Sequence, residues 1–478
     1  MQALFILVPL VLVVLLNLPF KQAYRKTAFY AAVFTAVFQM VLSLTSGFLL
    51  WKNITDLFSF NFIANLGVDF FSLVVLFTIG LISLISIAVC RSSYDKDKFN
   101  FFNLILIVMM GMNGVVLTRD IFSLYVFLEI TAVTSFILIA MDKGIEAFEG
   151  AFKYLVLSAL ATIFILSAIA FTFNDVHSLS YTDISSYLKG LGGHFPPQII
   201  AALVLFITGL SIKAGVVPFH GWLPDAYMSS PSAVSILLAG IVTKVAGVYT
   251  IMRFAGDIMN NITIVSNILM AFGALSIVIG ALAAIGQKDF KRILAYSSIS
   301  QIGYIILATG AGTPLAFAGA LLHFFNHATF KSLLFVNSAA VEYSTGTRDI
   351  DKLGGLAGKM PVTGVTSIIG FLSTMGMPPM AGFWSKLIII IAVWTSGNYT
   401  YSVIALLASI LTLAYFLILQ RKVFFGKLAE GLRNVKEAGA LMSFSAILLA
   451  LITVAAGLAF PFIIYYLQAH GLLKLVIS

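Results

Sequence analysis

The sequence predicts an all-helical integral membrane protein with about fourteen transmembrane helices. Of its 478 residues, 60% are hydrophobic and only 10% are charged, and the mean hydropathy is +1.04. Apolar segments long enough to cross a bilayer recur along the whole chain, and only short polar loops separate them. Because lipid cannot satisfy backbone polar groups, helices are the expected spanning elements, and no soluble domain is expected.

The order of the spans follows from where the apolar runs begin and end. The first run has basic residues after it and none before it, which is the wrong order for a cleaved signal peptide, so it is expected to be a retained span. The divisions at 118/120 and 286/291 rest on short polar links. The expected spans are 2–20, 27–51, 63–90, 101–118, 120–141, 150–173, 198–218, 231–255, 262–286, 291–310, 313–341, 361–395, 401–425 and 440–466.

The basic residues indicate the topology. Most of the 28 Lys and Arg residues fall in loops that follow odd-numbered spans. By the positive-inside rule, these loops lie in the cytoplasm and both termini lie outside. The net charge of +9 is therefore interpreted as a topology signal, and no basic run indicates nucleic-acid binding.

The basic residues expected inside the spans are all lysine. Arginine cannot lose its proton in a protein, whereas a buried lysine can. Only one acid, Glu129, is expected well inside a span. Because a charge at mid-bilayer costs about 2.5–3.5 kcal/mol on insertion scales, we interpret these residues as functional. The lysines are Lys153, Lys213, Lys244, Lys331 and Lys386.

Two spans contain helix-breaking sequences. The seventh span ends in SIKAGVVPFHGWLPDAY (211–227), and the twelfth contains MGMPPMAGFWSK (375–386). Proline removes a backbone donor, and such backbone is tolerated in lipid only inside protein or beside a water-filled cavity. Paired interruptions at matching positions indicate an inverted repeat. The residues expected at the two breaks are Pro218, His220, Pro224, Pro378 and Pro379.

The two breaks lie five spans apart, which predicts two inverted five-helix repeats made of spans 4–8 and 9–13. Flanking helices would pack against them on both sides. The predicted divisions are 1–90 for spans 1–3, 101–255 for the first repeat, 262–425 for the second repeat, and 440–478 for the C-terminal helix.

Glu129 and Lys213 are expected to form an ion pair, since a lone intramembrane acid usually has a charged partner. A carboxylate hydrogen-bonded between helices is the alternative for Glu129. Lys213 and Lys244 could instead snorkel to an interface, and the depth of Lys386 depends on where its span resumes. For Lys153, four residues into its span, snorkelling and function remain equally open.

The segment HFFNHATFKSLLF places His323, His327 and Lys331 on one helix face. A proton relay is one interpretation, because imidazole titrates near neutrality. Metal binding through the two histidines and a structural polar seam are the others. No carboxylate or Cys is evident to complete a metal site.

Several other chemistries find no support in the sequence. The single cysteine, Cys90, excludes a disulfide framework and a Cys-ligated iron–sulfur cluster. There is no Gly-rich phosphate loop and no Ser/His/Asp or Cys/His set. We therefore expect no cofactor, metal or redox centre in this chain.

The motifs together resemble a known family. LYVFLEIT with Glu129, IKAGVVPFHGWLPDAYMSSPSAVSILLAGIVTK, FKRILAYSSISQIGY, HFFNHATFKSLLF and GMPPMAGFWSK are similar to the antiporter-like subunits of complex I, membrane-bound [NiFe] hydrogenases and Mrp-type Na+/H+ antiporters. The resemblance covers about 100–425. It implies fourteen helices, two inverted repeats and a hydrophilic axis at mid-membrane. Some relatives carry Glu at the last position, where this chain has Lys386.

The resemblance implies roles for these residues. Glu129 and Lys213 would form the ion pair, and Lys244 would be the central relay. His323, His327 and Lys331 would help to carry the proton, and Lys386 would be the terminal donor or acceptor. Opening the pair would make the Lys213 proton easier to lose and would push it toward Lys244.

The expected function is that of a proton- or Na+/H+-translocating subunit of a redox-driven complex in a prokaryotic plasma (inner) membrane. Its partners would be homologous antiporter-like subunits and iron–sulfur, hydrogenase or dehydrogenase subunits, which leaves open whether it belongs to an enzyme. The alternatives are an Mrp-type antiporter subunit without a redox partner and a structural or quinone-site subunit. The absence of a long lateral helix after the last span favours the shorter members of the family.

Overall fold

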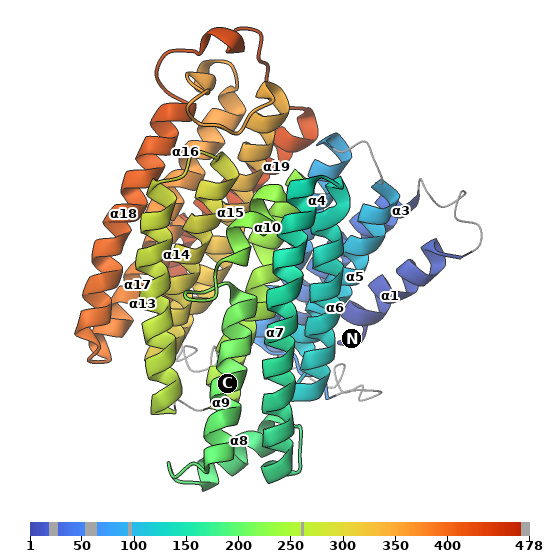
Figure 1. The fold of residues 1–478 in the computed structure, drawn as a ribbon, viewed down its shortest axis with the longest axis vertical. Helices are drawn as coiled ribbons and strands as arrows, with labels where there is room; N and C mark the ends of the chain where they lie inside the picture. The colour runs from blue at the N-terminus through green and yellow to red at the C-terminus, as the bar shows by residue number, and fades with distance from the viewer. Residues whose placement is uncertain (19–26, 53–64, 94–97, 260–261, 470–478) are drawn as a thin grey trace.

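The computed structural model describes residues 1–18, 27–52, 65–93, 98–259 and 262–469. The described chain forms a bundle of helices whose long axes run mostly in one direction (Figure 1). Within these residues, strand pairing is limited to isolated bridges. Predictions that involve 53–64 or the tail 470–478 lie outside the described residues.

The helices follow the predicted apolar runs closely. In the N-terminal half they are α1 (Leu4–Leu16), α3 (Thr27–Trp51), α4 (Phe70–Ser93), α5 (Lys98–Leu117), α6 (Ile121–Ile139), η2 (Ala140–Asp142), α7 (Ile145–Val176), α8 (Tyr181–Gly190), α9 (Pro197–Ala214) and α10 (Trp222–Ser229). In the C-terminal half they are α13 (Thr263–Ile285), α14 (Phe290–Ala311), α15 (Pro314–Thr345), η6 (Leu356–Gly358), α16 (Pro361–Met375), α17 (Ala381–Thr395), α18 (Tyr399–Val423), η7 (Glu430–Leu432) and α19 (Ala440–Ala469).

Eleven helices in the described chain are long and apolar enough to cross a membrane, compared with the fourteen spans predicted. The difference has three sources. α1 has only 13 residues, the predicted span 361–395 is divided into α16 and α17, and α15 carries many polar side chains. The predicted loop 174–197 also contains a short helix, α8.

Both predicted breaks are present. α9 ends at Gly215, which has a φ of 65°, and α16 ends at Gly376, which has a φ of 82°. Glycine adopts this left-handed conformation readily because it has no Cβ. Pro218, His220, Pro378 and Pro379 lie in the non-helical links, whereas Pro224 lies in the first turn of α10. Pro224 is therefore not part of the break, because a proline in a first turn removes no helical hydrogen bond.

Matching backbone contacts recur in the two halves of the chain. Asp120 accepts hydrogen bonds at the start of α6, and Asp289 does so at the start of α14. Asp120 forms an antiparallel bridge with Ser180, and Asp289 forms one with Asp349. In both halves, the chain after the next long helix therefore returns to the beginning of the capped helix.

The span 232–258 is buried along its whole length and is not a regular α-helix. It begins as α11 (Ser232–Leu237) and ends through α12 (Thr250–Arg253), and the turns between and after them are wider. These turns are η3 (Leu238–Val242), η4 (Lys244–Tyr249) and η5 (Phe254–Ile258), all of the π type. Such turns often occur at functional sites, because they redirect side chains.

Two glycines let this span approach its neighbours closely. A Cβ on Gly247 would lie 2.3 Å from the backbone of Ala214, the residue after Lys213. A Cβ on Gly240 would lie 2.3 Å from the Ser332 hydroxyl, next to Lys331. The buried span is thus held directly between the end of α9 and the middle of α15.

Candidate functional site

Glu129 on α6 and Lys213 on α9 form the predicted ion pair. Their Oε1 and Nζ atoms are 3.0 Å apart. The Lys213 side chain is only 4% exposed, whereas that of Glu129 is 29% exposed. The pair therefore has one member in the interior and one at the surface of this chain.

Helix α7 supplies hydroxyl groups to both members of the pair. Thr162 donates to Glu129 Oε1 at 2.5 Å, and Lys213 Nζ donates to the Ser158 hydroxyl at 3.3 Å. Ser158 and Thr162 are four residues apart and so lie on one helix face. When the pair opens, each charge keeps one polar neighbour.

Lys244 is fully buried at the start of η4. Its ammonium group donates to the backbone carbonyl of Ala239. Nearby, the Tyr227 and Thr243 hydroxyls are 2.6 Å apart. Among the described residues, no carboxylate forms a salt bridge with Lys244, Lys331 or Lys386.

Lys331 is bound by groups of the neighbouring helix α14. Its Nζ donates to the Ser297 hydroxyl at 2.6 Å and to the Leu294 carbonyl at 3.2 Å. Tyr415 on α18 donates to the same Ser297 hydroxyl at 2.8 Å. Lys331 is thus fixed by neutral oxygens alone, which suits a lysine that changes its charge.

The two histidines of α15 lie one turn apart, with parallel rings whose centroids are 6.2 Å apart. His323 Nδ1 is 2.9 Å from the Ser385 hydroxyl on α17. Within the described residues, His323 Nε2 and both ring nitrogens of His327 have no hydrogen-bond partner. Buried polar groups of this kind are normally satisfied by ordered water.

Lys386 is buried on α17, just past the second break. Its Nζ donates to the Thr374 carbonyl at 2.6 Å, in the last turn of α16, and lies 5.0 Å from the centre of the Tyr304 ring. The break exposes this carbonyl by ending the helix, so the interrupted backbone itself provides the oxygen that holds the lysine.

The structure brings most of the predicted residues into one buried array. Lys244, Lys331 and Lys386 are all close enough to His327 to interact with it electrostatically. The glycine contacts join Lys244 to the helix ends that carry Lys213 and Lys331. We call the set of Glu129, Lys213, Lys244, His323, His327, Lys331 and Lys386 the central array.

Lys153 lies apart from the central array, at the end of α7. Its side chain is 41% exposed and is 2.6 Å from both Glu149 and Asp225. Asp225 is also 3.4 Å from Arg292. These contacts form a partly solvated ion cluster and provide no direct contact with Lys213.

Sequence reasoning placed Arg253 in a loop, and this is wrong. Arg253 lies in the span 232–258 with a side chain that is 8% exposed, so the basic residues inside the spans are not all lysine. It pairs with Asp69, the residue before α4, and lies 3.4 Å from Asp257. Asp69 also pairs with Arg119 at 3.2 Å.

These contacts perturb the Asp69 carboxyl. Burial by itself would raise its pKa, but the Arg253 and Arg119 guanidinium groups hold the pKa well below its usual value. The sequence offered no signal for this cluster, because its members are far apart in the chain. Its contacts tie the outer end of the span 232–258 to α4.

Lys291 was also placed in a loop, yet it lies in the first turn of α14 with a side chain that is 2% exposed. It pairs with Glu342 near the end of α15 at 3.1 Å. The described residues contain no group of three or more His, Cys, Asp or Glu side chains placed to hold a metal ion. Cys90 is a buried free thiol.

Comparisons with known proteins agree on one family. A family model described as NADH:quinone oxidoreductase/Mrp antiporter, TM, matches residues 118–412. The chain is 35% identical over 323 residues to NADH-quinone oxidoreductase subunit N of Desulforudis audaxviator, covering 67% of this chain and 64% of that protein. It is 34% identical over 322 residues to a protein of the Na(+)/H(+) antiporter of Alkalihalophilus pseudofirmus, covering 67% and 65%.

These alignments span less than two thirds of either relative. Among solved structures, the membrane-bound sulfane sulfur reductase, an archaeal respiratory membrane complex, contains a chain with a TM-score of 0.86 and 27% identity. That superposition covers 100% of this chain and 98% of the other. The three matched proteins come from three different kinds of membrane complex.

Proposed function

The chain belongs to the NADH:quinone oxidoreductase/Mrp antiporter transmembrane family, and from this premise we propose that it translocates protons as a subunit of a larger membrane complex. The proton would move along the central array, from Lys213 through Lys244 and the polar face of α15 to Lys386. The observation that supports this most directly is the row of buried lysines held by hydroxyl and carbonyl oxygens.

The Glu129–Lys213 pair would control the first step. While the pair is closed, the carboxylate stabilises the charged lysine at 3.0 Å. When it opens, Lys213 keeps only the Ser158 hydroxyl, and its proton becomes easier to transfer to Lys244. Water at the unpartnered nitrogens of His323 and His327 would carry the proton onward.

The exposure of Glu129 supports a neighbouring subunit. A carboxylate that is 29% exposed on this chain would otherwise face lipid, where a charge is costly. Residues beside it, Phe122, Val126 and Val133, are exposed and apolar. An adjoining membrane subunit, of the antiporter-like kind, would cover this face and place a polar or basic group near Glu129.

We propose that the fold comprises fourteen spans arranged as two inverted repeats, 101–255 and 262–425. The matched caps at Asp120 and Asp289 and the matched breaks at Gly215 and Gly376 support this arrangement. The odd-numbered loops would be cytoplasmic and both termini outside, in a prokaryotic plasma membrane. The chain itself would hold no cofactor or metal.

The experiment that tests this function replaces Lys213 or Lys244 with arginine in the assembled complex. Lys213→Arg and Lys244→Arg keep the charge but remove a releasable proton, so proton uptake into vesicles should fall by about 100-fold. Lys422→Arg is the matched control, because Lys422 is a half-exposed residue that pairs with Asp351 away from the array. If either array variant assembles and pumps normally, lysine titration is not the mechanism.

An Mrp-type antiporter without a redox partner is the second candidate, and the 34% identity to a protein of an Na(+)/H(+) antiporter favours it. The composition of the purified complex discriminates the two. Copurifying iron–sulfur or nickel subunits would indicate a redox-driven complex, whereas small membrane subunits alone would indicate an antiporter. Normal pumping by both Glu129→Gln and Lys386→Ala would instead indicate a structural role.

A further inference from the structure

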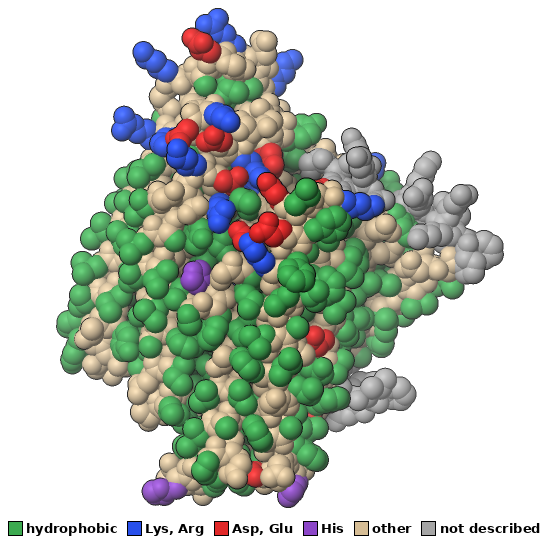
Figure 2. Space-filling model, in the orientation of Figure 1, with side chains coloured by type: hydrophobic (Ala, Val, Ile, Leu, Met, Phe, Trp, Pro, Cys, Tyr) green, Lys and Arg blue, Asp and Glu red, His purple; other side chains and the backbone are tan. Residues whose placement is uncertain are grey.

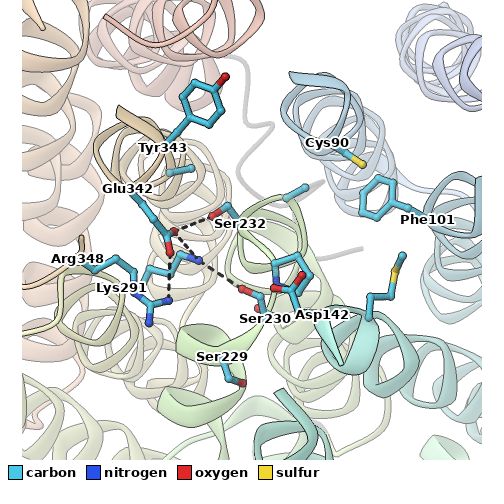
Figure 3. Close-up of a pocket in the computed structure, with 14 residues that line it drawn as sticks. Cys90, Phe101, Asp142, Ser229, Ser230, Ser232, Lys291, Glu342, Tyr343 and Arg348 are labelled. Atoms are coloured by element: carbon cyan, nitrogen blue, oxygen red, sulfur yellow. Dashed lines mark hydrogen bonds and ion pairs between the residues drawn. The ribbon is translucent and has the colours of Figure 1, made fainter. Parts of the chain in front are cut away.

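A cavity of about 230 Å³ lies at one end of the bundle, between α4, α5, α14, α15 and the start of α11. Figure 3 shows Glu342, Lys291 and Ser232 pointing toward one another on one side of it, with Cys90 and Phe101 on the opposite side. Lys and Arg side chains gather at this end in Figure 2, the end expected to face the cytoplasm. None of the seven residues of the central array lines this cavity.

One wall of the cavity is an ion network centred on Glu342. Its carboxylate is 3.1 Å from Lys291 Nζ and 3.6 Å from Arg348, and it accepts a hydrogen bond from Ser232 at 3.0 Å. Lys291 also donates to the Ser230 carbonyl at 3.3 Å. Glu342 is one-third exposed whereas Lys291 is almost fully buried, so the carboxylate stands between the cavity and the lysine.

The other ionisable groups of the cavity come from different elements. Asp142 lies at the end of η2, Cys90 on α4, and Tyr343 on α15 beside Glu342. Arg348, in the loop after α15, is also paired with Asp289 at 3.0 Å. Glu342 is therefore the carboxylate that both lines the cavity and contacts a buried lysine of α14.

A polar seam leads inward from Glu342 between α14 and α15. Ser338 is one turn inside Glu342 on the same helix face, followed by Asn337 and Ser332, and Gln301 lies on α14. In the described part of the chain, the Ser338 and Ser332 hydroxyls, the Asn337 Nδ2 atom and the whole Gln301 amide are buried without a hydrogen-bond partner. Unpartnered buried groups in a row indicate water between the helices.

The seam ends at Lys331. This lysine is held by Leu294 and Ser297 of α14, and Lys291 is on the same helix. Lys291 and Ser297 are six residues apart, which is about 9 Å along a helix axis. The distance from the ion network to the central array is therefore short enough for a few water molecules to bridge.

Resting on the proposed transport function, we propose that this cavity is the cytoplasmic mouth of the proton path and that Glu342 carries protons from it to Lys331. A proton from cytoplasmic water binds the Glu342 carboxylate and weakens its pairing with Lys291. The proton then passes along water and the Ser338 hydroxyl to a neutral Lys331 amine. Glu342 becomes a carboxylate again, Lys331 becomes an ammonium, and the pair with Lys291 re-forms.

The first test measures water access to the seam. Ser338→Cys is introduced into the otherwise unchanged complex, a charged, membrane-impermeant thiol reagent is added from the cytoplasmic side, and modification is read on the peptide by mass spectrometry. Ser445→Cys is the control, because Ser445 is equally buried near the start of α19 and bonds only within its own helix. We expect Ser338→Cys to react at least about tenfold faster; equal rates would overturn the proposal.

The second test measures transport. Glu342→Gln should reduce proton uptake by about tenfold or more, and Glu342→Asp, which keeps a titratable group, should restore part of it. Asp351→Asn removes a carboxylate at the same end, outside the cavity, and should leave uptake unchanged. Normal uptake by an assembled Glu342→Gln complex would overturn the proposal.

The two proposals fail in different ways. If Ser338→Cys is no more reactive than its control while Lys213→Arg still abolishes uptake, the cytoplasmic path lies elsewhere and the transport function stands. If the unmodified complex moves no protons, the transport function itself fails, whatever the labelling shows.

Discussion

Replacing Gly247 with alanine tests whether close helix contact holds the central array together. A Cβ at this position would lie 2.3 Å from both N and Cα of Ala214, whereas ordinary contacts begin at 3.4 Å. The atoms it meets are backbone atoms and cannot rotate away, so η4 and the end of α9 must separate by roughly 1 Å. Such overpacking typically costs about 1–3 kcal/mol, partly offset by the better helix propensity of alanine, up to about 1 kcal/mol.

The same displacement moves Lys244 away from Lys213. A misplacement of about 1 Å can reduce the rate of a positioned transfer by about 100-fold, so transport should suffer more than stability does. Thermal unfolding of the purified complex and proton uptake into vesicles measure the two effects separately. Gly286→Ala is the control, because a Cβ there meets only the Ala283 carbonyl at 4.0 Å. A Gly247→Ala complex with normal uptake would refute the idea that this contact positions the array.

Two further predictions concern the ion pairs. Glu129→Gln leaves Lys213 buried without its carboxylate and should destabilise the protein by about 3 kcal/mol, the low end for a broken buried pair because Glu129 is partly exposed; an unchanged unfolding temperature would contradict this. Asp69→Asn deprives the buried Arg253 of its main partner and should cost a similar amount, roughly 3 kcal/mol, at pH 7. Because the folded state lowers the pKa of Asp69, this stabilisation is fully present above its unfolded pKa of about 3.9 and is lost as the pH falls toward the lower, folded pKa. The difference in unfolding temperature between wild type and Asp69→Asn should thus be constant from pH 7 to about pH 5 and shrink below about pH 4; a difference that shrinks between pH 7 and pH 5 would rule out Asp69 as its source.

Much of the fold was predictable because membrane helices are encoded locally. Apolar run length determines where helices form, and the prolines after Gly215 and Gly376 mark where two of them break. The pairing of Glu129 with Lys213 was predictable for a different reason. A lone acid in lipid requires a partner, and few charged groups were available at that depth.

The same reasoning failed at the ends of helices. Arg253 and Lys291 lie close to polar residues in the sequence and were therefore placed in loops, yet both are buried by ion pairs with residues far away in the chain. Hydropathy cannot distinguish a loop cation from a buried, paired one, because the partner supplies what water would otherwise supply. Pro224 was assigned to the break for a similar reason, since sequence alone does not show where a helix resumes.

The sequence by itself determined that this is a multi-span helical membrane protein, which residues carry protonatable groups within it, and where its helices are interrupted. Only the tertiary structure decided which of those groups meet. The π turns of the span 232–258 and the absence of a Cβ at Gly240 and Gly247 set the distances between Lys213, Lys244 and Lys331. Side chains meet through the packing of helices that are distant in the chain, and no local pattern specifies that packing.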